Sequence, residues 1–501
     1  MKLYLVLFLL FIKCFNGFCQ QIPATYNCSC NKIGLDSVWA DTNKVACYLI
    51  PVERNCVNPR GEQYLLAVAT APALSKSPKE PLLYLHGGPG IATLSNCPRY
   101  FKSKTFSLLR QDHDLVFFDY RGTGYSEPVL CKTLSPALNA IPDTISTEGR
   151  IAKEVVLYTN CKDSLLQQGV HLSDFSSLQS ATDAETIRKA LGIKNLVIYS
   201  VSHGTTVALN MMRSFPKHIN SVILDSPFPP NAPWLDFIHP FDTCFKVLEK
   251  NIRQDPAYAT LFPSVRNDFV KITARLRQSP FKMPLNKEKD GTVPVASFDN
   301  SDFAWSVWSA MLDPYYIRLV PLALKEIASG NDSALYHWAM LLNDPNSFGE
   351  FSSAQSRAIL GYETKPRFEA ETENYLLKNF PDFSSFITPG LDSAIYSAYR
   401  PENPPPGYFD AVKTKIPTLI FSGEYDPVCP PLFAKGSAKT LKRSTVVIVP
   451  AASHAAMYAD DCTRAMAKEF YLKPNEKINT ACLKDRKAIS FVTSGILAFL
   501  K

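Results

Sequence analysis

The sequence lacks the patterns that mark nucleic-acid-binding and metal-dependent proteins. Its lysines and arginines are scattered, so the formal net charge of +7 is not gathered into a basic block. We therefore expect no nucleic-acid partner, because such partners are bound by clustered positive charge. The sequence also contains no CxxC pair, no HExxH motif and no GK[ST] phosphate loop. These absences predict that the protein uses neither a metal ion nor a cofactor.

Long apolar runs are scarce as well. Residues 3–12 form an apolar run that follows Lys2 and precedes the small residues Gly17 and Cys19. The run is too short to span a bilayer comfortably, and it has the layout of a cleaved secretory signal. We assign residues 1–19 to this signal, with cleavage after Cys19, and an uncleaved anchor is the alternative. The mature protein is then expected to be secreted or periplasmic, in either case extracytoplasmic, with no stable membrane span.

Cysteine, in contrast, is plentiful. Of the 13 cysteines, Cys14 and Cys19 fall within the predicted signal, and the others remain in the exported chain. So many cysteines in an exported protein predict disulfide bonds formed in an oxidising compartment. The number that remains is odd, so at least one thiol is expected to stay unpaired. Residues 20–60, which include Cys28 and Cys56, form a cysteine-rich N-terminal segment.

Short apolar runs separated by longer helical patterns follow this segment. After an alternating stretch at 62–73, they occupy residues 81–86, 114–119, 195–200, 221–226, 416–422 and 444–450. Such runs are typical of buried parallel strands, whose two faces are both covered by helices. The sequence therefore predicts an α/β fold with a mostly parallel sheet and helices on both faces.

No comparable run occurs between Pro227 and about Pro405. The interval is rich in helical and aromatic patterns and ends in the Pro-rich PENPPPGYFD, which we interpret as a linker. We predict a core in two parts, 61–235 and 406–501, interrupted by a mainly helical cap insertion at 236–405. An independent second domain is the alternative. Near the C-terminus, Ile489, Val492, Ile496 and Phe499 would line one face of a helix packed on the body.

The stretch YSVSHGTTVAL, which follows the apolar run LVI, places Ser202 at a strand-to-helix junction. A tight turn there raises a serine above the sheet, at the N-terminus of the next helix. The positions two before and two after the serine must be small, and here they are Ser200 and Gly204. A lone serine is a weak nucleophile, so this interpretation requires a base and an orienting acid.

Two later strand-end loops supply these groups. FSGEYDPVCPP places Asp426 after one strand, and PAASHAAMY places His454 after the next. Carboxyl ends of parallel strands share one edge of a sheet, so Ser202, Asp426 and His454 are predicted to form a catalytic triad. Asp225 is an alternative acid.

The loop HGGPG, residues 86–90, follows an earlier strand. Its glycines let the backbone approach a substrate closely, so Gly87 and Gly88 are candidates for an oxyanion hole, together with the N–H of His203. A tight structural turn is the alternative. In the next loop, DYRGTGYSEP, we expect Asp119 and Arg121 to brace their neighbours.

The chain contains, in this order, HGGPG, DYRGTGYSEP, the serine turn, GEYDPVCPP and SHAAMY. With these motifs it resembles the proline iminopeptidase and tripeptidyl aminopeptidase family of α/β-hydrolases. The similarity runs from residues 45–71 to Cys482, interrupted by the helical insertion, and is closest to the secreted branch. It implies the same nucleophile, acid, base and oxyanion loop that the motifs indicate. It also implies disulfides between Cys131 and Cys161 and between Cys462 and Cys482. Ser200 and His203 depart from the family, which usually has glycine and an aromatic residue there.

The resemblance implies a secreted serine exopeptidase that cleaves peptide bonds near free N-termini through an acyl-enzyme. Its partners would be peptides with a free N-terminus, whose ammonium needs carboxylates to hold it. Candidates are Asp302, Asp313 and Glu326 in the insertion; Glu424 either contacts substrate or braces its loop. A secreted carboxylesterase or lipase with the same triad is the alternative, because the aromatic insertion would also suit an acyl pocket. A non-catalytic binding protein on this fold is a third hypothesis.

Overall fold

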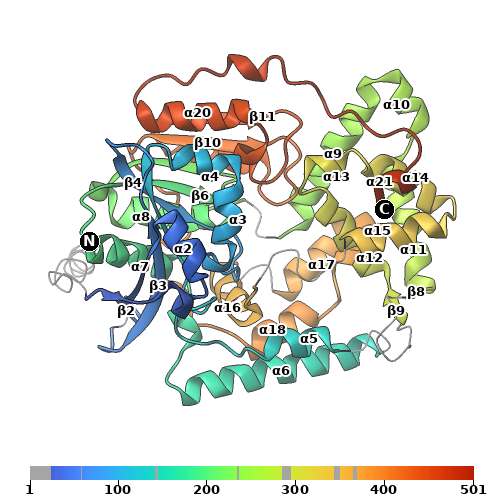
Figure 1. Ribbon diagram of the computed structural model, residues 1–501. Coiled ribbons are helices and arrows are strands. Elements are labelled where there is room, and N and C mark those ends of the chain that lie inside the picture. Colours follow the sequence, from blue (N-terminus) through green and yellow to red (C-terminus); the bar gives the residue numbers. More distant parts are fainter. Residues whose placement is uncertain are drawn as a thin grey trace, which may run out of the picture.

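A computed structural model of the chain describes residues 24–57, 59–141, 145–233, 236–284, 295–342, 350–364 and 369–500. The predicted signal at residues 1–19 lies outside the described residues. Figure 1 shows two neighbouring bodies, a layered core built on a sheet and a helical body beside it. We call residues 236–405 the cap.

A single large sheet organises the core. Within the described residues it has nine strands, in the order β1-β2-β3-β5-β4-β6-β7-β10-β11. Strands β5, β4, β6, β7, β10 and β11 run parallel, whereas β1, β2 and β3 are joined by antiparallel pairing. The strands are β1 (Tyr26–Asn27), β2 (Ala46–Glu53), β3 (Gln63–Ala71), β4 (Lys79–Leu85), β5 (His113–Phe118), β6 (Leu196–Val201), β7 (Ile219–Asp225), β10 (Thr418–Gly423) and β11 (Ser444–Val449).

The predicted α/β class with a mostly parallel sheet is confirmed. Each apolar run identified in the sequence coincides, within a few residues, with one of the strands β3 to β7, β10 and β11. The cysteine-rich segment 20–60 also contributes, because β1 and β2 lie within it and extend the sheet. Most residues of β4, β6, β7 and β10 are buried, as expected for parallel strands covered on both faces.

Helices cover the two faces of the sheet. One apolar layer contains buried residues of α3, α4 and α20, and the layer on the other face contains those of α7, α8 and α19. A short helix near the N-terminus, α2, carries Trp39 against the first layer. The bounds are α2 (Ser37–Asn43), α3 (Cys97–Lys102), α4 (Lys104–Leu109), α7 (Ser177–Ala190), α8 (His203–Ser214), α19 (Pro431–Ala438) and α20 (Asp461–Leu472).

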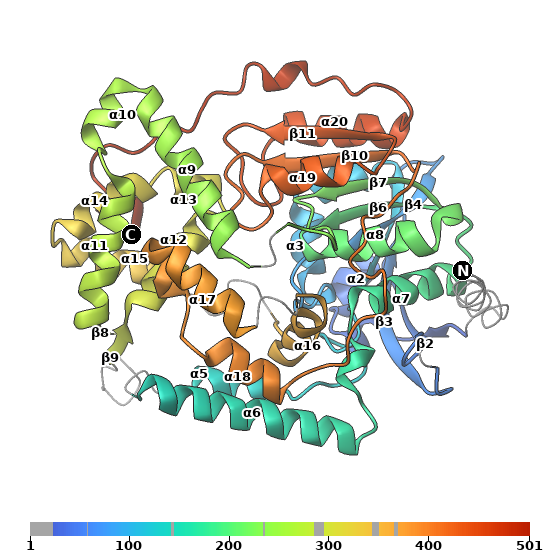
Figure 2. The same cartoon turned by 180° about the vertical axis from the view of Figure 1, so that it is seen from behind.

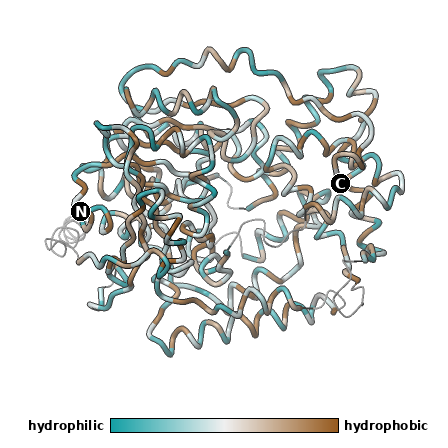
Figure 3. Tube along the Cα trace, viewed as in Figure 1, coloured by the Kyte–Doolittle hydropathy of each residue, from teal (hydrophilic) through white to brown (hydrophobic). Residues whose placement is uncertain are grey.

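The cap has an apolar interior of its own, formed mainly by α9, α11, α12, α14 and α15. Figure 2 shows it beside the core, and Figure 3 shows hydrophobic positions in the interiors of both bodies. The cap elements are α9 (Ile238–Gln254), α10 (Pro256–Leu261), α11 (Val265–Gln278), α12 (Asn300–Ala310), α13 (Pro314–Ile317), α14 (Val320–Ala328), α15 (Asp332–Leu342), α16 (Ser353–Glu363), α17 (Ala370–Asn379), the 3-10 helix η6 (Pro381–Phe386) and α18 (Leu391–Ala398).

Two features of this region differ from the sequence-based expectation. The insertion contains a small antiparallel pair, β8 (Phe281–Pro284) and β9 (Val295–Phe298), where we expected no strand. In addition, α5 (Leu134–Asn139) and α6 (Thr147–Gln167) share an apolar cluster with α16 and α18 of the cap. Their sequence position before the serine turn led us to place them in the core, but their apolar sides pack on cap helices.

The C-terminal segment connects the two bodies. It leaves α20, is tied back by the Cys462–Cys482 disulfide, and ends on the cap in α21 (Leu497–Leu500) (Figure 1). After the 3-10 helix η8 (Ala481–Leu483) and a short turn, residues 486–493 form no helix, and Val492 N–H donates to the Arg318 carbonyl at 2.9 Å. Phe491, Val492 and Ile496 belong to the buried interior of the cap. The predicted helical face is therefore absent from residues 486–496, which we call the C-terminal strap, and its apolar side chains enter the cap from a non-helical segment.

Replacement of Phe491 by alanine tests this docking. Phe491→Ala is expected to lower the free energy of unfolding by about 3 kcal/mol, because it removes a buried ring. Phe499→Ala is the matched control, since its ring is 36% exposed and its loss is expected to change stability by less than about 0.5 kcal/mol. Urea unfolding followed by fluorescence measures both variants. Equal effects would contradict docking of the segment on the cap.

Candidate active site

Ser202 stands at the turn between β6 and α8 with an unusual backbone conformation. Its φ is 54° and its ψ is −127°, a region that residues other than glycine rarely adopt. Such strain persists only where the surroundings impose it, and it is common at functional sites. The side chain is therefore presented at the end of β6 and not along the strand, as expected for a nucleophile.

The neighbours of the serine explain why small residues flank it. A Cβ at Gly204 would lie 2.1 Å from the Leu85 carbonyl oxygen, so any larger residue would displace β4 from α8. Ser200 is fully buried on β6, and its hydroxyl donates to the Ile223 carbonyl at 2.9 Å. Serine thus fits where the family usually has glycine, because its one polar atom is satisfied within the sheet.

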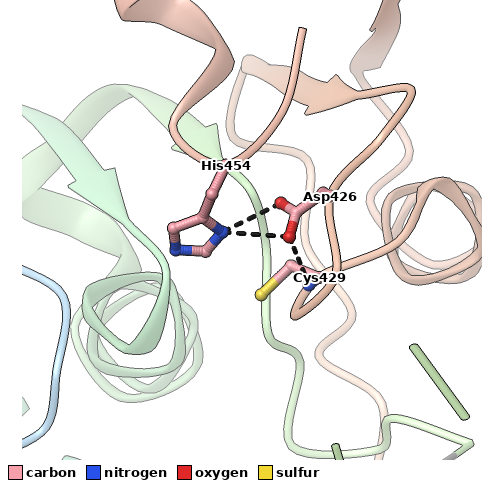
Figure 4. A group of neighbouring side chains, drawn as sticks. All are labelled: Asp426, Cys429 and His454. Atoms are coloured by element: carbon pink, nitrogen blue, oxygen red, sulfur yellow. Dashed lines mark hydrogen bonds and ion pairs between the residues drawn. The ribbon is translucent and has the colours of Figure 1, made fainter. Parts of the chain in front are cut away.

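Asp426 and His454 face each other from the loops after β10 and β11. The Nδ1 atom of His454 lies 2.9 Å from Asp426 Oδ2 and 3.1 Å from Oδ1 (Figure 4). The Asp426 Oδ1 atom also accepts from the N–H groups of Val428 and Cys429, at 2.9 and 2.8 Å. These bonds fix the carboxylate, so it can hold the imidazole in one tautomer and orientation.

The charges of this pair reinforce one another. Burial alone would raise the pKa of Asp426, but the charge of His454 and the hydrogen bonds to the carboxylate lower it below its ordinary value. Burial would lower the pKa of His454, but the charge and hydrogen bond of Asp426 raise it above its ordinary value. The arrangement therefore stabilises an imidazolium, the form that a general base becomes after accepting a proton.

The hydroxyl of Ser202 lies between this pair and the glycine loop. It lies near the Cys429 thiol, and a Cβ at Gly87 would be 3.6 Å from its Oγ atom. Within the described residues, no hydrogen bond joins Ser202 to His454. In serine hydrolases this contact often tightens only when substrate is bound.

The glycine loop is oriented by His86. Desolvation lowers the pKa of His86 to about 4, so its ring is neutral near pH 7. Its Nδ1 atom donates to the Gly87 carbonyl at 3.0 Å, which fixes the peptide plane that also carries the Gly88 N–H. The N–H of His203 is the other candidate donor, because the first N–H groups of a helix have no partner within it.

The ring of His203 belongs to a buried polar network that the sequence did not indicate. Its Nε2 atom lies 2.9 Å from Ser177 Oγ and 3.5 Å from Glu363 Oε2, and Tyr408 OH donates to Glu363 Oε1 at 2.5 Å. Burial would raise the pKa of Glu363, but its contacts with His203, Tyr408 and Ser177 lower it. Glu363 ends α16, so this network ties the cap to the helix that follows the candidate nucleophile.

Asp225, the alternative acid, accepts hydrogen bonds from residues other than His454. Its Oδ2 atom accepts from Tyr199 OH and from the N–H of Met457, both at 3.1 Å. Burial raises the pKa of Asp225 to about 7. The residue therefore anchors the loop after His454, while Asp426 makes the hydrogen bond to the imidazole.

The bracing predicted for DYRGTGYSEP is visible in its contacts. Asp119 accepts from the N–H groups of Thr93 and Leu94, at 2.7 and 2.8 Å, and so holds the chain just beyond HGGPG. Arg121 is buried and binds Asp183 through two nitrogens, at 2.8 and 2.6 Å.

Each of the three acids predicted to hold an ammonium group accepts a hydrogen bond from a residue nearby in the sequence. Asp302 accepts from the N–H of Asp299 at 3.0 Å, and Asp313 accepts from the N–H of Tyr315 at 2.8 Å, each at a helix start. Glu326 accepts from the Asn331 amide at 3.3 Å. Glu424 accepts from the Ala451 N–H at 3.0 Å, which links the loops of the candidate acid and base.

The cap touches each loop of the candidate site. Cys244 of α9 donates to the Tyr425 carbonyl at 2.8 Å, and Ser453 donates to the Met311 carbonyl. Phe351 pairs with Ile91 beside the glycine loop, and the flanking backbone bonds are 2.8 and 3.0 Å long. The cap therefore covers this edge of the sheet through contacts next to the acid, the base and the glycine loop.

The structure joins Cys131 to Cys161 and Cys462 to Cys482, the two pairs that the family resemblance implies. It also joins Cys30 to Cys47, which the sequence left open. Free thiols among the described residues are Cys28, Cys56, Cys97, Cys244 and Cys429. Cys429 was visible in GEYDPVCPP, but no spacing rule pointed to its proximity to the serine.

Comparison with known proteins identifies the class. Residues 80–461 match the family described as the alpha/beta hydrolase fold, and the chain belongs to that family. The tripeptidyl aminopeptidase of Streptomyces lividans is 25% identical over 284 residues, which cover 54% of this chain and 52% of that protein. The serine protease Hip1 of Mycobacterium bovis is 28% identical over 190 residues, 36% of this chain and 35% of that one.

A proline iminopeptidase of Neisseria gonorrhoeae is 22% identical over 159 residues, which cover 31% of this chain and 36% of that protein. The matches thus span about half, or less, of the length of these relatives. Among solved structures, a proline iminopeptidase of Mycobacterium smegmatis aligns with a TM-score of 0.36 at 13% identity, over 83% of this chain and 97% of that one. The predicted membership of the α/β-hydrolases is confirmed.

Asp426→Asn tests the assignment of the acid. The amide removes the charge of Asp426 that raises the pKa of His454, so burial, the largest influence on this pKa, lowers it. The acid limb of kcat/KM should therefore move to lower pH, while kcat falls about 10³- to 10⁴-fold because the tautomer is no longer fixed. Asp225→Asn is the control and should have a much smaller effect on kcat. A larger loss in Asp225→Asn would contradict the assignment.

Proposed function

We propose that the protein is an extracytoplasmic serine exopeptidase that cleaves peptide bonds near free N-termini. Ser202 attacks the carbonyl carbon, and His454 takes its proton and later gives it to the leaving amine. Asp426 holds the imidazole, and the N–H groups of Gly88 and His203 stabilise the oxyanion. The observation that carries the proposal is the strained Ser202 turn beside the hydrogen-bonded Asp426–His454 pair.

The relatives' names support a peptidase over other hydrolases. Tripeptidyl aminopeptidase, serine protease and proline iminopeptidase are all names of enzymes that cleave peptides. Each match covers only part of either chain, so the peptidase assignment stays a proposal for this protein.

A small cavity in the cap supports recognition of an ammonium group. Its volume is about 50 Å³, and its lining combines carboxylates and aromatic rings, including Asp236, Glu373, Asp392, Phe237, Trp305 and Phe386. Ammonium groups are bound well by carboxylates and by the faces of aromatic rings. We propose this cavity as the subsite for the substrate's N-terminus, in place of Asp302, Asp313 and Glu326, because it combines three carboxylates with aromatic rings.

Export of the chain is supported by its covalent structure. Three disulfides link described cysteines, as is usual in oxidising compartments. Of the helices that the structure describes, none has the length and hydrophobicity needed to cross a bilayer.

Esterase or lipase activity is the second candidate, and the aromatic cap favours it. The rings of Trp305 and Trp308 have centroids 5.4 Å apart, and that of Phe237 lies 6.0 Å from Trp305. Such a cluster would also suit an apolar acyl chain.

Aryl-amide substrates with free and acetylated N-termini separate the two candidates. The wild type should cleave the free forms at least about 100-fold faster in kcat/KM, because a blocked amine loses a charged contact worth about 3 kcal/mol. Ser202→Ala should reduce kcat by about 10⁶-fold and abolish labelling by a phosphonate probe. Equal cleavage of free and acetylated forms, or turnover of acyl esters alone, would refute the exopeptidase assignment.

Glu373→Gln tests the proposed subsite. Its Oε1 atom accepts from the Gly390 N–H at 2.8 Å, a bond that the amide oxygen of glutamine can keep while the charge is lost. We expect KM for free-amine substrates to rise about tenfold with kcat little changed, which corresponds to one lost ionic contact. Glu371→Gln, on the same helix, is the matched control. If Glu373→Gln and Glu371→Gln had the same KM, the cavity would not be the subsite.

A further inference from the structure

Three different metal-binding side chains converge beside the candidate nucleophile. Ligand atoms of Asp426, Cys429 and His454 all lie within 4.8 Å of one another (Figure 4). Among the free thiols of the described chain, Cys429 is the one found in such a group. The absence of zinc-spaced pairs in the sequence does not bear on this group, because it is assembled from two loops after different strands.

We propose that Asp426, Cys429 and His454 form an inhibitory site for a divalent zinc ion. Thiolate, imidazole and carboxylate are the three side-chain ligands that zinc takes in proteins, and three protein ligands leave one coordination position for water. Binding of the ion depends only on these side chains. Its inhibitory effect rests on the proposed function of His454 as the base.

The three donors are held in place before any ion arrives. The Cys429 N–H donates to Asp426 Oδ1 at 2.8 Å, which ties the thiol-bearing residue to the carboxylate. The two loops also meet closely, because a Cβ at Gly423 would lie 2.0 Å from the Ser453 carbonyl oxygen. Little conformational entropy remains to be lost on binding, which favours affinity.

His454 is the one partly exposed residue of the three. The His454 side chain is 19% exposed, whereas the Asp426 side chain is not exposed at all. Cys429 is fully buried and lies near Ser202. An ion entering past His454 would therefore meet the carboxylate and the thiol from the face where the proposed substrate binds.

Zinc binding at this site releases a proton from the thiol and changes no oxidation state. The proton on Nδ1 of neutral His454 moves to Nε2 through solvent, and zinc then bonds to Nδ1. The S–H bond of Cys429 breaks, its proton goes to solvent, and zinc bonds to the thiolate. Asp426 supplies the third ligand. His454 then has no free lone pair at Nε2 to accept the Ser202 proton, so the proposed reaction stops.

Direct metal titration of the full-length mature chain tests the site. Zinc binding is measured by competition with a chromogenic chelator, and cobalt is used as a spectroscopic substitute. We expect one zinc ion per chain and a cobalt-thiolate charge-transfer band. Cys429→Val should lose the band and bind zinc about 100-fold more weakly. Cys429→Thr is the second variant in case valine prevents folding.

Cys56→Ser is the matched control. It removes a free thiol that accepts a hydrogen bond from the Thr182 hydroxyl at 3.4 Å and does not belong to the group of Asp426, Cys429 and His454. It should bind both metals as the wild type does. Unchanged zinc affinity in Cys429→Val and Cys429→Thr, or absence of the cobalt band in the wild type, would overturn the proposal.

Activity measurements separate this proposal from the proposed function. Zinc should abolish hydrolysis of the free-amine aryl-amide by the wild type, and a chelator should restore it. If zinc binds to the three residues but no substrate is cleaved even without zinc, the proposed exopeptidase function is refuted and the zinc site is supported. If hydrolysis continues with one zinc ion bound per chain, the inhibitory role of the site is refuted and the exopeptidase function is supported.

Discussion

The hydrogen bond between Asp426 and His454 is the interaction on which the rest of the site depends. It joins the loops after β10 and β11, and each loop is held from several sides so that this one contact can form. Backbone N–H groups fix the carboxylate, Glu424 bridges to the second loop, and Asp225 anchors the residues after the histidine. Neither charge would be stable in so buried a position without the other, since isolated buried charges are costly.

The parts of this arrangement that follow from chain order could be predicted. Apolar runs gave the strands, and a parallel sheet brings the carboxyl ends of β4, β6, β10 and β11 to one edge. Ser202, Asp426, His454 and the glycine loop follow these strands directly. Their proximity needs no knowledge of side-chain packing, so the sequence alone was enough to bring them together.

The contacts made by the cap could not be predicted from the order of the strands along the chain. Glu363 lies 160 residues beyond His203 and carries no motif, yet its carboxylate is 3.5 Å from that ring. The pairing of α5 and α6 with α16 and α18 depends on how two helical segments pack across the fold, which periodicity does not specify. Cys429 was visible in its motif, but its distance to the imidazole depends on the shape of a loop. The acids of the insertion were chosen from composition, and composition does not distinguish a helix cap from a ligand.

The C-terminal strap has a mechanical consequence for the cap. An insertion is ordinarily joined to its core at its two ends, which can act together as one hinge. Here the strap adds a third connection, and the backbone pairing of Phe351 with Ile91 adds a fourth point of contact. A body attached at several separated points cannot rotate about a single axis without breaking one of them. Motion of the cap as one rigid body relative to the core therefore requires at least one of these contacts to break.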